Sequence, residues 1–129
     1  QYRDTLQMKD AVVFLAVGGN DLPSQTLGNF QTDLTTAVNK IRVAGAAQIW
    51  VFTITPFLSY IANNAVRVQC NDHVKTRPDG ITGVIDADAL LGVGSALNVL
   101  YNNGDGDHWN DVGHGVVADD VYAQVGNPR

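Results

Sequence analysis

The chain has little that would tie it to nucleic acid, to a membrane or to a disulfide framework. Its 8 basic residues are outnumbered by 13 acidic ones and are scattered, so they form no patch for nucleic acid or an anionic membrane. No apolar run approaches the roughly 20 residues of a membrane span. A single cysteine, Cys70, excludes an internal disulfide and a cysteine-based zinc site, and we expect it to be a small buried residue.

The composition is that of a folded domain. Apolar residues make up 45% of the 129 residues and charged residues only 16%, which is too apolar for a disordered chain. There is no internal repeat, linker or low-complexity segment. We therefore expect residues 1–129 to form a single domain.

Three apolar segments predict strands, and three amphipathic segments predict helices between and after them. The run from Ala11 to Val17 is continuously apolar, which is typical of a strand covered on both faces in a parallel sheet. Further strands are expected over residues 49–54 and 83–86. Apolar residues at helical spacing predict a helix over 27–44 that stops at Gly45, and further helices over about 61–76 and from Asn110 or Asp111 to about Val125. The alternation predicts an α/β fold with right-handed crossovers.

Ligands of such sheets bind beyond the carboxyl ends of the strands. There the first strand is followed by Gly18, Asn20 and Asp21, and the second by Thr55 and a proline. A Gly-Gly turn allows close backbone approach to a ligand, and the Asn20 amide can donate a hydrogen bond to an oxyanion. The alternative is an ordinary turn, because these residue types are common in turns.

The strongest candidates for catalytic side chains lie near the end of the printed sequence, where Asp105 and His108 are three residues apart in a Gly-rich loop. A carboxylate so placed can orient an imidazole that acts as a general base. Calcium is the alternative for the Asp-Gly-Asp run, but the twelfth-position glutamate of an EF-hand is missing; we expect neither a metal nor a cofactor. Asp107 or Asn110 is expected to cap the final helix. His114 and His73 are read as packing, surface or locally bonded residues.

The order of these motifs resembles the SGNH hydrolases, also called the GDSL esterase and lipase family. The resemblance rests on Gly-x-Asn-Asp after a buried strand, Thr-Pro after the next strand, and Asp-x-x-His-x-Asn-x-x-Gly before the last helix. It covers nearly the whole chain. It implies a three-layer α/β/α, flavodoxin-like fold that here lacks its first strands.

Residue by residue, the resemblance implies catalytic roles for Asp105 and His108 and an oxyanion hole with Asn20 and Gly18. Asp21 and Asn110 match supporting positions of the two motifs, as does the glycine three residues after Asn110. Where the family often has proline after the histidine, this chain has Trp109. That tryptophan is read as a pocket wall and possible sugar platform, with Thr55 as a second substrate contact.

The family's Gly-Asp-Ser block is missing from the chain. The only serines are Ser24, Ser59 and Ser95, and none follows a buried strand in that context. Without a neighbouring strand, the apolar segment from Ala11 to Val17 would be an open sheet edge. We therefore expect the serine on a separate or missing N-terminal segment of the same protein, which would complete the sheet.

The resemblance implies an esterase that needs no cofactor. The low aromatic content, 8%, favours a small acyl ester or an acetylated carbohydrate as the substrate. Acidic charge and family habit point to secretion. The alternative hypothesis is an SGNH-like binding or structural module that lacks a nucleophile and carries out no reaction.

Overall fold

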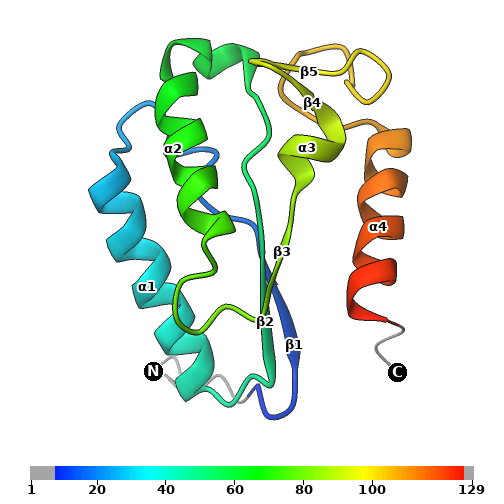
Figure 1. Cartoon of the computed structure of the whole chain (residues 1–129). Helices are drawn as coiled ribbons and strands as arrows, with labels where there is room; N and C mark the ends of the chain where they lie inside the picture. Colours follow the sequence, from blue (N-terminus) through cyan, green and yellow to red (C-terminus); the bar gives the residue numbers. More distant parts are fainter. Residues whose placement is uncertain (1–7, 127–129) are drawn as a thin grey trace, which may run out of the picture.

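The computed structural model describes residues 8–126 as a small parallel sheet with helices on both of its faces (Figure 1). The elements follow one another in the order β1 (Val12–Leu15), α1 (Leu27–Val43), β2 (Gln48–Phe52), η1 (Leu58–Asn63), α2 (Asn64–Lys75), β3 (Gly83–Ile85), α3 (Ala87–Leu91), β4 (Gly92–Val93), β5 (Ala96–Leu97) and α4 (Asp111–Val125). The main sheet has the order β1-β2-β3 and is parallel throughout, whereas β4 and β5 form a separate antiparallel pair. The predicted α/β class is therefore confirmed.

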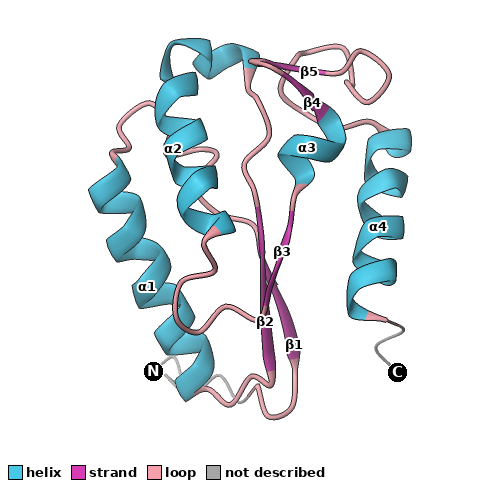
Figure 2. Cartoon of the chain, in the orientation of Figure 1, coloured by secondary structure: helices cyan, strands magenta, loops and turns pink. Residues whose placement is uncertain are grey.

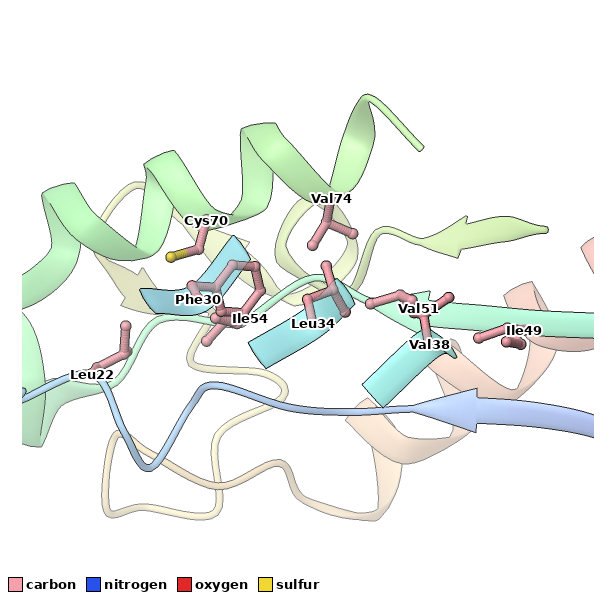
Figure 3. Packing of buried hydrophobic residues seen from close by; sticks show 9 residues of the cluster. All are labelled: Leu22, Phe30, Leu34, Val38, Ile49, Val51, Ile54, Cys70 and Val74. Carbon is pink, nitrogen blue, oxygen red and sulfur yellow. The ribbon is translucent and has the colours of Figure 1, made fainter. Parts of the chain in front are cut away.

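The helices form two layers around the sheet. Helices α1 and α2 lie together on one side of it, and α4 lies on the other (Figures 1 and 2). Two apolar clusters fill the spaces between these layers. The larger one, on the α1 and α2 side, consists of Leu22, Phe30, Leu34, Val38, Ile49, Val51, Ile54, Cys70 and Val74 (Figure 3). Cys70 is completely buried, as expected, and its burial raises the pKa of the thiol.

Helix α1 forms where the apolar spacing predicted it. Phe30, Leu34 and Val38 point into the larger cluster because they recur every four residues. The Thr26 hydroxyl caps the first turn by accepting from the backbone N–H of Asn29. Gly45, with a φ of 97°, lies just past the end, where its N–H donates to the Arg42 carbonyl in a Schellman turn. Gly45 thus stops the helix as predicted.

The strands are shorter than the apolar runs that predicted them. The prediction for β2 extended to Ile54, but the strand ends at Phe52. The backbone of Ile54 is bound instead by side chains of α2, since its N–H donates to Asn71 and its carbonyl accepts from Asn71 and Arg67. Likewise β1 ends at Leu15, not Val17.

Strand β1 is only partly covered by the rest of residues 8–126, and none of its four residues is fully buried. It pairs with β2 on one edge, and no other strand among residues 8–126 pairs with its second edge. Phe14, which faces α4, is 37% exposed. The prediction of a fully covered strand is therefore wrong for the described residues taken alone.

Three further features differ from the predictions. The helix expected over 61–76 begins with the 3-10 segment η1, which is interrupted at Tyr60 by a φ of −123° and a ψ of 30°. Helix α3 and the β4–β5 pair were missed because they are only five and two residues long and depend on distant contacts. No helix in residues 8–126 is long and apolar enough to cross a membrane.

A buried charge network joins α2 to the segments around it. The Arg67 side chain is 2% exposed and donates to Asp88 at 2.6 Å, to the Ile54 carbonyl at 2.8 Å and to the Gly94 carbonyl at 3.2 Å. Asn71, one turn later, donates to Asp88 as well. The network holds together the end of β2, α3 and the turn between β4 and β5.

We predict that Arg67→Ala lowers the free energy of unfolding by about 3–5 kcal/mol, because it leaves the Asp88 carboxylate without its buried partner. Urea denaturation followed by circular dichroism measures this change. The matched control is Lys75→Ala, which removes an ion pair to Asp86 whose side chains are 41% and 37% exposed, and which should cost less than about 1 kcal/mol. Equal losses from the two variants would contradict a structural role for the buried network.

Candidate active site

The Asp105 and His108 side chains form a hydrogen-bonded pair in the loop between β5 and α4. Asp105 Oδ2 lies 2.7 Å from His108 Nδ1, while Asp105 Oδ1 accepts from the backbone N–H groups of Asp107 at 2.8 Å and of His108 at 2.9 Å. Backbone N–H groups of the loop thus hold the Asp105 carboxylate, and the carboxylate in turn orients the His108 imidazole. A neutral imidazole that donates through Nδ1 carries its lone pair on Nε2, which makes Nε2 the basic atom.

The pair shifts the protonation of both groups. The backbone N–H groups of Asp107 and His108, followed by the imidazole, hold the pKa of Asp105 far below its usual range. In turn, the hydrogen bond and the charge of Asp105 raise the pKa of His108. Because the folded-state pKa of His108 is raised, its protonation favours folding at low pH, and this contribution is lost as the pH rises through the folded-state pKa.

Hydrogen bonds rather than burial hold the loop in place, since the side chains of His108 and Asp105 are 72% and 49% exposed. The Asn102 side chain accepts from the N–H groups of Gly104 and Gly106, and the Asn103 N–H donates to the His108 carbonyl. These short-range bonds join the loop's backbone to its own side-chain and carbonyl oxygens at the protein surface.

Asn110 connects this loop to the last helix. Its side-chain oxygen caps α4 by accepting from the Gly113 N–H at 3.0 Å, and its amide donates to the carbonyls of Leu100 and Asn102. A Cβ at Gly113 would lie 3.2 Å from Tyr101, so the tight packing here favours glycine. The alternative cap, Asp107, binds elsewhere and does not cap the helix.

A cavity of about 480 Å³, here called the turn cavity, lies beyond the carboxyl ends of β1 and β2. Of the predicted site residues, the walls include Gly18, Asn20, Asp21, Thr55 and Trp109. Gly18 has a φ of 90°, and a Cβ there would lie 2.8 Å from the Phe30 ring. The turn therefore requires glycine at position 18, and it leaves Asn20 exposed on the cavity.

Trp109 links the turn cavity to the loop that carries Asp105 and His108. It follows His108 directly in the chain, and its indole N–H donates to the Thr55 hydroxyl at 3.1 Å. Asp105, His108 and Asn110 themselves do not line the turn cavity. The structure thus brings the two predicted groups of site residues to the same end of the sheet, with Trp109 and Thr55 as the contact between them.

The other two histidines each make contacts of their own. The His114 ring packs against Trp109 with a centroid distance of 5.2 Å, and His73 lies 3.3 Å from the Gln31 amide. Within residues 8–126, no three His, Cys, Asp or Glu side chains are placed to hold a metal ion.

The contacts of Ser59 and Arg67 were not predicted from the sequence. Ser59 binds the Asp107 carboxylate through both its hydroxyl and its backbone N–H, although 48 residues separate them. Nothing local in the sequence marks that pairing. Arg67 had a weak signal, since it shares one face of α2 with the buried Cys70, Asn71 and Val74 at a spacing of three, four and seven.

No family model and no curated protein matches this chain.

We predict that Asp105→Asn lowers the pKa of His108, because the carboxylate charge that favours the imidazolium is removed. An NMR titration of the His108 ring protons measures the change. Asp119→Asn, an exposed substitution within α4, is the matched control and should leave the His108 titration as it was. The same His108 pKa in Asp105→Asn and in the unaltered protein would mean that the two side chains do not interact in solution.

Proposed function

We propose that this chain supplies the Asp-His pair and the oxyanion turn of a serine ester hydrolase of the SGNH type, with the three-layer, flavodoxin-like fold of that family. The single observation that carries the proposal is the 2.7 Å contact between Asp105 and His108. The same carboxylate accepts two backbone N–H bonds, which is the arrangement expected of a group that orients a base and stabilises its protonated form.

In this mechanism, His108 Nε2 takes the proton of a serine hydroxyl while the serine oxygen bonds to the ester carbonyl carbon. The bond to the alcohol then breaks, and His108 returns the proton to the departing oxygen. Water repeats the sequence with the acyl group and releases the acid and the serine. Asp105 stays ionised throughout and stabilises the imidazolium, and no cofactor takes part.

The oxyanion that forms on the carbonyl carbon needs hydrogen-bond donors at the turn cavity. Asn20 is the donor that we propose, because its side chain is exposed at the cavity, in the turn that Gly18 opens. Asp21 follows in the same turn, where its backbone carbonyl accepts from the Ser24 N–H at 3.0 Å and so shapes the turn. Loss of one such donor costs roughly 3 kcal/mol of transition-state stabilisation.

The nucleophile is proposed to come from an N-terminal segment of the same protein that carries a Gly-Asp-Ser block. Among residues 8–126, no serine hydroxyl is hydrogen-bonded to His108. Ser59 binds Asp107, Ser24 donates to the Asp21 carbonyl, and Ser95 lies in the turn between β4 and β5. The base thus has no serine partner in the described part of the chain.

Two surfaces beside the site support such a segment. The second edge of β1 presents backbone N–H and C=O groups to which an added strand can bond. Beside it, a groove of about 480 Å³ runs between the sheet and α4, here called the α4 groove and lined by Phe14, Phe52, Val117, Val121 and Tyr122 among others. An apolar groove next to a free sheet edge is suited to a strand with a helix attached, because together they supply backbone bonds and apolar contacts.

The substrate that we propose is a small acyl ester, including acetyl esters of carbohydrates. The turn cavity is open and has both polar and apolar walls, with Trp109 and Thr55 at its side. Because the Thr55 contact already uses the indole N–H, Trp109 would contact a sugar through its ring face. Because of the same family resemblance, we propose that the protein is secreted. We propose no nucleic-acid partner and no membrane partner.

We predict that His108→Ala in the complete protein lowers turnover of p-nitrophenyl acetate by roughly 10⁴-fold or more, because the base of the triad is lost. The matched control is His73→Ala, since His73 contacts Gln31 in the α1 and α2 layer and not the site. A spectrophotometric assay of both variants provides the measurement. Near-normal hydrolysis by His108→Ala would refute the assignment.

Labelling with a fluorophosphonate tests the origin of the nucleophile. We expect a single adduct, mapped by mass spectrometry to a serine of a Gly-Asp-Ser segment that co-purifies with this chain or precedes it. Its formation should depend on His108. If the complete protein forms no adduct and hydrolyses no ester, the alternative is correct, and the domain is an SGNH-like binding or structural module.

A further inference from the structure

The start of η1 makes three hydrogen bonds to the middle of the loop that carries Asp105 and His108, here called the catalytic loop. The Leu58 N–H donates to the Gly106 carbonyl at 3.2 Å, and the Ser59 N–H donates to Asp107 Oδ1 at 2.9 Å. The Ser59 hydroxyl donates to Asp107 Oδ2 as well. Both oxygens of the Asp107 carboxylate are thus bound by one serine.

The two segments are also fitted to each other in shape. Gly106 has a φ of 83°, and a Cβ at this position would lie 2.6 Å from Leu58 Cβ. Only glycine lets the loop approach η1 so closely. The contact therefore depends on Gly106 for its shape and on Ser59 for its polar bonds.

A direct path leads from this contact to the catalytic pair. Asp107 uses its side chain for Ser59 and its backbone N–H for Asp105 Oδ1, the oxygen that also accepts from the His108 N–H. Since the pair is exposed, packing contributes little to holding it in place. The position of the Asp105 carboxylate thus depends on where Asp107 is held.

Two other roles for these residues fit the structure less well. Asp107 does not cap α4, because the Asn110 side chain does so. Ser59 is not placed as the nucleophile, since its hydroxyl donates to Asp107 and is not hydrogen-bonded to His108. Ser59 belongs instead to η1, in the segment that follows the Thr55 wall of the turn cavity.

We propose that Ser59 and Asp107 are positioning residues, which hold the loop so that Asp105 orients His108. The effect of this positioning on catalysis rests on the proposed function. Neither residue touches the turn cavity, so their effect reaches the reaction only through the catalytic pair. The contact joins η1, in the middle of the chain, to a loop 48 residues further on.

The charges that act on His108 decide which variant tests this proposal best. Asp105 is the main one, and Asp107 adds a weaker attraction for the imidazolium. The facing element η1 contributes no charged side chain; its one titratable residue, Tyr60, stacks beside Phe57. Ser59→Ala is therefore the cleaner variant, because it loosens the loop without removing a charge.

We predict that Ser59→Ala in the complete protein lowers the pKa of His108, because the looser loop weakens the contact with Asp105. It should also lower kcat about tenfold, as expected for loss of one hydrogen bond to a charged group, with KM unchanged. Ser59→Thr should restore both values, since it keeps the hydroxyl. Ser95→Ala is the matched control. NMR titration of His108 and steady-state kinetics provide the measurements.

The titration requires no turnover, so its result is separate from the fate of the proposed function. A lowered His108 pKa in Ser59→Ala that returns in Ser59→Thr supports the positioning role even in a protein without esterase activity. An unchanged His108 pKa in Ser59→Ala overturns it. A fluorophosphonate adduct on Ser59 also overturns it, because Ser59 would then be the nucleophile.

Discussion

The buried guanidinium of Arg67 is the contact on which the arrangement of this domain depends. It comes from α2 and reaches the end of β2, α3 and the β4–β5 turn at once. A charge removed from water is costly unless its hydrogen bonds are satisfied, and here carbonyl oxygens, the Asn64 side chain and the Asp88 carboxylate satisfy them. The Asn71 side chain also bonds to the backbone N–H and carbonyl of Ile54. Side chains of α2 therefore hold the segment that leads from β2 to the site.

The site itself is built in a different way. Its loop is exposed and lies at the edge of the domain, so local hydrogen bonds hold it where burial cannot. The Asn102 and Asn110 side chains bond to backbone groups of the loop. Ser59 binds the Asp107 carboxylate, and Trp109 joins the loop to Thr55. A drier setting would strengthen the attraction between the Asp105 carboxylate and the His108 imidazolium, which is now weakened by water. Under the proposed function, the segment beside β1 would provide that setting.

Much of the fold could be predicted because its signals are local. The apolar spacing of Phe30, Leu34 and Val38 predicted α1, and Asn110 marked the start of α4 correctly. Helix α3 and the β4–β5 pair could not be predicted, since elements of five and two residues have too little pattern of their own. They form because Thr53, Arg67 and Asn71 bind them from other parts of the chain.

The same distinction divides the candidate site. The contact between Asp105 and His108 spans three residues, so their spacing in the sequence was enough to predict that they pair. The cap by Asn110 was likewise predictable from a separation of three. By contrast, the bonds from Ser59 to Asp107 and from Trp109 to Thr55 join residues 48 and 54 positions apart. No spacing rule covers such separations; only the order of the strands and the packing of the helices bring these side chains together.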